Sequence, residues 1–117
     1  MVSVKVSSYR FGSVRIDGKT YRHDVLLIGD EILHPWERRE GHSLHPDDLT
    51  WLITREPKTL IVGTGAFGRL RVPEETKAWL TKQGIELIAL PTKEAIVEYN
   101  RRVAAGERAA CGLHLTC

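Results

Sequence analysis

The sequence predicts an α/β domain in which an antiparallel β-meander is followed by alternating helices and strands. Two turn pairs, Asp17-Gly18 and Gly29-Asp30, separate short β-prone runs in the first third of the chain. Farther along, amphipathic helical patterns alternate with apolar runs, which implies parallel strands joined by crossovers. Residues 60–62 are apolar at every position, as expected of a strand covered on both faces.

The start of the chain allows two interpretations. Val2, Val4 and Val6 alternate with polar residues, which fits either an edge strand or a disordered first segment over residues 1–8. At 117 residues, the whole chain (residues 1–117) is expected to form one domain whose single core needs no disulfide or metal.

The meander has clear turn signals. An alternating run at residues 13–16 leads into Asp17-Gly18, and a β-prone pattern resumes after that pair. Residues 23–28 form the next expected strand, and residues 31–36 return after the second turn. Pro35 places this last strand at an edge or at its own end, because proline cannot donate to a ladder.

Three helices are expected in the remainder of the chain. The first starts at Pro46, with two aspartates at the positive end of its dipole. The second starts at Pro73, and the third starts at Thr92, which is expected to cap it. Strands are expected between and after them, at residues 85–90 and 108–115.

Composition and charge exclude some classes of function. The net charge is only +2, so charge gives no reason to expect a nucleic-acid partner. No apolar run approaches the roughly 20 residues that span a membrane, and the first residues lack the apolar core of a signal peptide. The only cysteines, Cys111 and Cys117, are expected to be reduced thiols. A cytoplasmic protein with no membrane association is therefore expected.

The loop over residues 63–68 matches G-x-G-x-x-G and follows a predicted strand, as the dinucleotide fingerprint requires. Two features disfavour a nucleotide site: the helix starts only at Pro73, and no acid follows the next strand to hold a ribose. The glycines then serve either the geometry of the loop alone or a pocket for a small molecule or anion, with Thr64, Arg69 and Arg71 nearby.

The segment from Cys111 to Cys117 has C-x-x-H-x-x-C spacing around His114. On an extended strand, residues three apart point to opposite faces, so adjacent members of this trio are expected to diverge. We therefore predict no metal site here, a buried Cys111 and a His114 that hydrogen-bonds locally. No serine elbow or lysine-bearing phosphate loop is present, and neither a catalytic residue nor a cofactor is predicted.

The connection before the first helix is rich in histidine and arginine. His34, His42 and His45 are expected to be solvated loop residues. Residues 36–39 (WERR) form either a corner held by cation–π or ionic contacts, or an apolar lid with solvated arginines.

Four stretches together carry a family resemblance: FGSVRIDGKTYRHDVLLI, PWERREGH, TLIVGTGAFGRLRVP and GLHLTC. In this order, from Tyr9 to Cys117, the chain resembles the Mth-type domain of the adipogenesis-associated domain protein family, which includes a mitochondrial complex I assembly factor. The positions that match the family pattern are Gly12, Asp17, Gly18, Tyr21, Trp36, Arg38, Gly41, His42, Gly63, Gly65, His114, Thr116 and Cys117.

The resemblance implies a three-layer α/β fold with a central mixed sheet and an antiparallel β-segment packed on it. It implies no established enzymatic activity, and action through protein partners. Our first hypothesis is thus a non-catalytic protein-interaction or assembly domain with an unknown protein partner, as a monomer or homodimer. This hypothesis predicts an apolar patch beside the glycine loop.

The second hypothesis is a protein that binds a small molecule or anion, or a cryptic enzyme. It predicts a concave pocket where the glycine loop, the start of the third helix and the end of the chain meet, because ligands of open α/β sheets bind beyond the carboxyl ends of the strands. A filled rim would contradict it. The candidate pocket residues are Gly63, Thr64, Gly65, Gly68, Arg69, Thr92, His114, Thr116, Cys117, Trp36 and Arg38.

Overall fold

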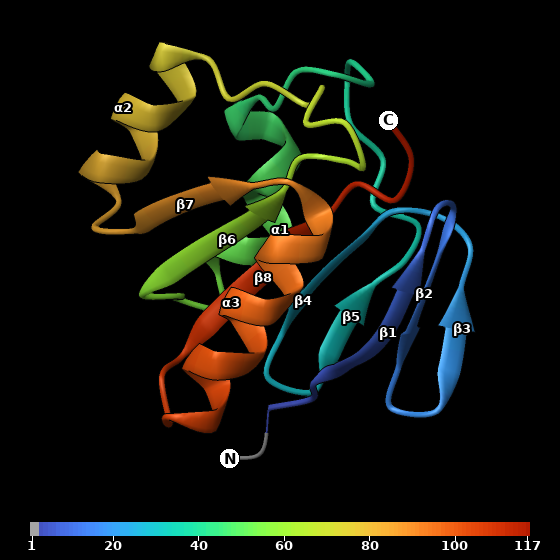
Figure 1. Ribbon diagram of the computed structural model, residues 1–117. Helices are drawn as coiled ribbons and strands as arrows, with labels where there is room; N and C mark the ends of the chain where they lie inside the picture. Colours follow the sequence, from blue (N-terminus) through green and yellow to red (C-terminus); the bar gives the residue numbers. More distant parts are fainter. Residues whose placement is uncertain (1–2) are drawn as a thin grey trace.

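A mixed five-stranded sheet forms the centre of the computed structural model, which describes residues 3–117 (Figure 1). In spatial order its strands are β5 (Glu31–Leu33), β4 (Val25–Ile28), β8 (Ala109–Leu113), β6 (Thr59–Gly63) and β7 (Glu86–Leu90). Strands β6, β7 and β8 are parallel, whereas β4 runs antiparallel to both β5 and β8. The predicted strand at residues 60–62 is confirmed: all residues of β6 are buried.

A separate three-stranded antiparallel sheet contains β1 (Val6–Arg10), β2 (Ser13–Ile16) and β3 (Lys19–Tyr21). The predicted Asp17-Gly18 hairpin is confirmed: both residues have positive φ, 49° and 80°, as a type I′ turn requires. The expectation for residues 1–8 falls partly on Met1 and Val2, which lie outside the described residues.

The expected meander is divided between the two sheets. Strands β4 and β5 are antiparallel neighbours, as predicted, but they belong to the central sheet. All residues of β4 are buried, so this strand needs cover on both faces. Pairing with β8 in the central sheet provides that cover.

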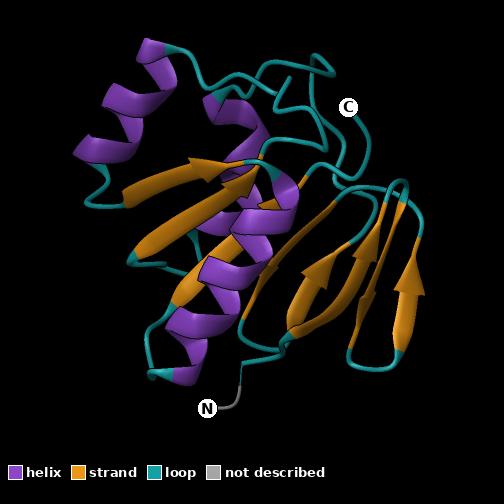
Figure 2. Ribbon diagram, viewed as in Figure 1, coloured by secondary structure: helices purple, strands orange, loops and turns teal. Residues whose placement is uncertain are grey.

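The central sheet is covered on both faces, and the chain has the predicted α/β fold with three helices (Figure 2). On one face lie helix α3 (Thr92–Ala104) and the small sheet, packed on Ile61 and Cys111. On the other lie the 3₁₀ turn η1 (Pro46–Leu49), the short helix α1 (Thr50–Ile53) and helix α2 (Glu74–Lys82). None of the helices between residues 3 and 117 is both long and apolar enough to cross a membrane.

The three predicted helix starts agree with the structure to different degrees. Helix α2 follows Pro73, as expected, and η1 begins at Pro46. The prediction that Thr92 caps the third helix is wrong: Pro91 is the cap residue, and Thr92 is the first helical residue. The Thr92 hydroxyl bonds to two other segments instead, because the end of β8 lies beside the start of α3.

The last strand is shorter than predicted, and this sets the course of the end of the chain. Strand β8 stops at Leu113, not at Leu115.

Beside the end of β8, the Trp36 ring packs so closely on Gly112 that a Cβ built there would lie 2.7 Å from the ring. The residue before β8's end must therefore be glycine for the buried tryptophan to lie on the sheet.

We expect Gly112→Ala to lower the free energy of unfolding by about 1–3 kcal/mol, since the added methyl group must displace a buried indole or the strand itself. Urea unfolding followed by circular dichroism measures the change. Gly41→Ala is the matched control: no atom lies within 4 Å of its built Cβ, so its effect should stay within about 0.5 kcal/mol. Equal effects of the two substitutions would contradict this packing.

Candidate functional site

The glycine loop and the last residues of the chain meet at one edge of the sheet. The loop, residues 63–68, follows β6, and the tail, residues 114–117, follows the parallel neighbour β8. The Ala66 amide donates to the Thr116 carbonyl at 2.7 Å, and the Arg69 amide donates to the main-chain oxygen of Cys117 at 3.1 Å. The loop thus binds a segment of its own chain.

Thr92 connects the same elements. Its Oγ1 accepts a hydrogen bond from the Gly65 amide at 2.8 Å and donates to the His114 carbonyl at 2.6 Å. The amides of Thr64, Gly68 and Leu70 also donate to main-chain oxygens. Most amides of the loop therefore already have an acceptor within the protein, which leaves few donors for an anion-binding nest.

Gly65 is required by the close approach of the tail. Its φ is +107°, and a Cβ at this position would lie 2.6 Å from the Cys117 carbonyl carbon and 2.9 Å from His114 Cδ2. Gly68 also has a positive φ, 67°, but its nearest neighbour would be Thr64 Oγ1 at 3.7 Å. Both glycines have a positive φ, but that of Gly65 lies outside the left-handed α region that other residues can enter, and only Gly65 also has a steric requirement.

Beside the tail lies a largely buried polar cluster of Asp24, Arg38 and His114. Asp24 Oδ2 lies 2.7 Å from Arg38 Nη2 and 2.8 Å from His114 Nδ1. Asp24 Oδ1 accepts a hydrogen bond from the Leu115 amide at 2.8 Å. The carboxylate therefore joins the segment before β4, the corner after β5 and the tail after β8.

Asp24 and Arg38 form an ion pair that is largely shielded from solvent. The Arg38 side chain is only 4% exposed, and its guanidinium lies over the Trp36 ring, 4.8 Å from the centroid. Burial alone would raise the pKa of Asp24, but hydrogen bonds from His114, Leu115 and Arg38 outweigh it and lower that pKa. Asp24 is therefore ionised and pairs with a buried cation.

Of the two interpretations of residues 36–39, the corner held by cation–π and ionic contacts describes Arg38. Arg39 instead lies at the surface, where it pairs with exposed Asp47 at 3.4 Å.

His42 also lies at the site, and it is exposed as predicted. Its Nε2 lies 3.5 Å from Cys117 Sγ, and its ring meets the His114 ring edge-on with centroids 5.5 Å apart.

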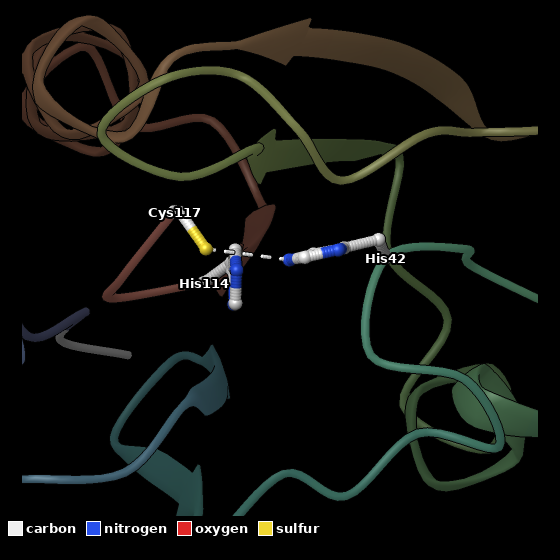
Figure 3. Close-up of side chains that lie close together, drawn as sticks. All are labelled: His42, His114 and Cys117. Atoms are coloured by element: carbon white, nitrogen blue, oxygen red, sulfur yellow. Dashed lines mark hydrogen bonds between the residues drawn. The ribbon is translucent and has the colours of Figure 1, made fainter.

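The structure brings His114 and Cys117 together with His42, and not with Cys111 (Figure 3). Cys111 is buried within β8, and burial raises the pKa of its thiol. The expectation that His114 and Cys117 diverge is wrong because the extended strand ends at Leu113 and the tail bends. The prediction assumed an extended strand up to Cys117, and this assumption does not hold after Leu113.

The other candidate residues are distributed around this centre. Thr64, Gly63 and Trp36 are buried beneath the site, while Gly68 and Arg69 are exposed at its margin. Sequence reasoning missed Asp24. Its only sequence signal is a carboxylate directly before a wholly apolar run, at residues 25–28.

An open cleft of about 960 Å³ lies beside His42. Charges of both signs line it: Glu40 and Glu74 oppose Arg71 and Lys77. The cleft is separate from the glycine loop, whose own concavity is filled by the tail.

Comparison with known proteins places the chain in a sequence family. Residues 6–114 match the family described as "Protein of unknown function (DUF498/DUF598)". The conserved hypothetical protein PH1505 from Pyrococcus horikoshii is 32% identical, with a TM-score of 0.78 over 97% of this chain and 99% of that one. A solved structure named MT938 is also 32% identical, with a TM-score of 0.81 over 98% and 100%.

A more distant structure shows the same fold. A Bordetella pertussis protein described as a Mth938-like domain is 20% identical, with a TM-score of 0.69 over 96% of this chain and 85% of that one. The fold of this chain is therefore Mth938-like, and the resemblance found in the sequence is supported at that level.

We expect Asp24→Ala to lower the free energy of unfolding by about 3–5 kcal/mol, because it leaves the buried Arg38 guanidinium without its counter-charge. Asp47→Ala, which removes the exposed partner of Arg39, is the matched control and should cost less than about 1 kcal/mol. Chemical denaturation of both variants at pH 7 checks the difference.

The stabilisation by Asp24 should also depend on pH in one direction. Its pKa is lower in the folded state, so the contribution is present above the unfolded value of about 4 and is lost as the pH falls through the folded pKa. The gap between wild type and Asp24→Ala should narrow below about pH 4. A gap that widens on acidification would contradict the assignment.

Proposed function

The chain belongs to the DUF498/DUF598 family of proteins of unknown function, and we propose that it is a non-catalytic interaction domain that binds an acidic protein partner. The contact surface is an exposed aromatic pair, Phe11 and Phe67, at the glycine loop. The observation that carries this proposal is the exposure of two neighbouring phenylalanines on turns whose main chain is anchored.

The two rings form a small apolar patch. Phe11 is 60% exposed and Phe67 is 72% exposed, and their ring centroids lie 6.5 Å apart. Single exposed apolar residues are ordinary, but neighbouring aromatic rings are enriched where proteins bind one another. The patch also lies beside the glycine loop, as the interaction hypothesis predicts.

Both rings are carried by segments that are anchored to the tail. The Gly12 amide donates to the Leu115 carbonyl at 2.9 Å, which fixes the turn after Phe11. On either side of Phe67, the Ala66 amide bonds to Thr116 and the Gly68 amide bonds to Gly65. A patch that is already ordered loses little conformational entropy on binding, which favours affinity.

The charges near the patch support an acidic partner. Arg10 precedes Phe11, and Arg69 follows the loop that carries Phe67; both are exposed. Among the described residues 3–117, neither guanidinium is within ion-pair distance of a carboxylate. Two unpaired cations beside an aromatic pair fit a partner with an apolar pocket and an acidic rim.

Two further arguments support an interaction role over a small-molecule site. The resemblance to the adipogenesis-associated domain proteins and the complex I assembly factor is to proteins that act through protein partners. The concavity of the glycine loop is also filled by the tail, which disfavours the pocket of the second hypothesis. The cytoplasm remains the compartment that we predict.

Photo-cross-linking tests the proposal. A benzoylphenylalanine placed at position 67 should give a discrete adduct with another protein in the cells that carry this gene. The same probe at Val97, a 66% exposed apolar residue on α3, is the matched control and should give no such adduct. Charge reversal at the margin, Arg10→Glu with Arg69→Glu, should reduce the adduct by at least about tenfold if an acidic rim is contacted.

Three outcomes would contradict the proposal. Equal labelling from positions 67 and 97 would show that exposure alone governs the reaction. An adduct between two copies of this chain would assign the patch to self-association. An adduct that is unaffected by charge reversal would exclude the acidic rim.

A further inference from the structure

We propose that His42, His114 and Cys117 form a binding site for a divalent metal ion of the zinc class. Each residue offers one ligand atom, and these atoms all lie within 4.8 Å of one another. His114 and Cys117 belong to the tail and His42 to the connection before η1, and the three side chains point toward one another (Figure 3). The inference is independent of the aromatic patch and of the proposed protein partner.

The hydrogen bonds of His114 prepare it as a ligand. Arg38 Nη2 has two protons, which go to Asp24 Oδ2 and to the Gly41 carbonyl, at 2.7 and 3.1 Å. Arg38 Nη2 also lies 3.2 Å from His114 Nδ1, but it has no proton left for this nitrogen. Because the Asp24 carboxylate can only accept, His114 Nδ1 carries a proton and donates it to Asp24 at 2.8 Å. This tautomer leaves the lone pair on Nε2.

His114 Nε2 has no hydrogen-bond partner within the described part of the chain, although it is buried. The His114 side chain is only 8% exposed. A buried hydrogen-bond acceptor without a partner is costly, so this nitrogen is suited to bind a metal ion through its lone pair. A carboxylate on one ring nitrogen and a metal on the other is the usual arrangement of a metal-binding histidine.

One of the three separations already agrees with tetrahedral coordination. Bonds of about 2.1 Å to nitrogen and about 2.3 Å to sulfur place neighbouring ligand atoms roughly 3.4–3.6 Å apart. His42 Nε2 and Cys117 Sγ already lie 3.5 Å apart. His42 is exposed and Cys117 is half-buried, so both side chains are free to close the remaining distance to His114.

The donor set selects the class of ion. Two imidazole nitrogens and one thiolate suit zinc and other borderline or soft transition metals, whereas calcium and magnesium prefer oxygen ligands. Binding transfers the Cys117 thiol proton to the solvent. Three protein ligands leave a fourth position for water or for another group.

The glycine loop gains a role in this arrangement. Cys117 reaches the two histidines because Gly65 allows the tail to pass at contact distance and because the Ala66 and Arg69 amides hold it there. The loop thus acts on the site indirectly, by positioning a ligand. It is not itself a ligand-binding rim.

Titration of the metal-free protein with Zn²⁺, followed by calorimetry, tests the site. We expect one ion per chain. Co²⁺ is the spectroscopic probe: a thiolate-to-cobalt charge-transfer band should appear in wild type and be absent in Cys117→Ser. Cys117→Ser and His42→Ala should each weaken Zn²⁺ binding by more than about 100-fold, and Asp24→Asn by roughly 10–100-fold, the loss typical of a hydrogen-bond partner of a ligand.

Two control variants separate the site from general effects. His23→Ala removes an exposed histidine outside the trio and should leave the affinity unchanged. Gly65→Ala should weaken Zn²⁺ binding, whereas Gly68→Ala, which also places alanine at a positive φ but does not meet the tail, should not. Circular dichroism confirms that each variant is folded.

Wild-type affinity in folded Cys117→Ser or His42→Ala would overturn the proposal, as would the absence of saturable Zn²⁺ binding by wild type. Phe67→Ser should retain full Zn²⁺ affinity. Failure of the cross-linking experiment would therefore leave the metal result unaffected, and the reverse also holds.

Discussion

The arrangement of the site depends on the interactions of the half-buried Asp24 carboxylate. This carboxylate accepts hydrogen bonds from Arg38, His114 and the Leu115 amide, and these belong to segments that are distant in sequence. Because Arg38 is almost fully buried, its guanidinium depends on Asp24 as its counter-charge. The tail contributes to this pair by donating hydrogen bonds from His114 and the Leu115 amide to the carboxylate, and the glycine loop holds the tail in place.

Two surfaces result from this one arrangement. On the outside, the anchored turns carry Phe11 and Phe67 as an ordered aromatic pair. Toward the corner, the same tail presents Cys117 to His42 and His114. Displacement of the tail would disturb both surfaces, so ligation of a metal at Cys117 would also stabilise the patch by holding the tail.

Local patterns were sufficient to predict most of the elements but not their long-range pairing. The Asp17-Gly18 hairpin, buried β6 and the start of α2 at Pro73 follow from turn chemistry and periodicity. That β4 pairs with β8 does not, since periodicity carries no information on which strands are neighbours. The same limit explains the site. Asp24 and His42 become functional candidates only when β4 and the corner lie beside the tail, and the bend after Leu113 has no signal in the sequence.

Amide hydrogen exchange measured by NMR tests the central claim, that the glycine loop binds the chain's own tail. The amides of Ala66 and Arg69, which donate to Thr116 and Cys117, should exchange at least about tenfold more slowly than in an unstructured peptide. In Gly65→Ala this protection should be lost, while it should persist in Gly68→Ala. Unprotected Ala66 and Arg69 amides in the wild-type protein would contradict the account.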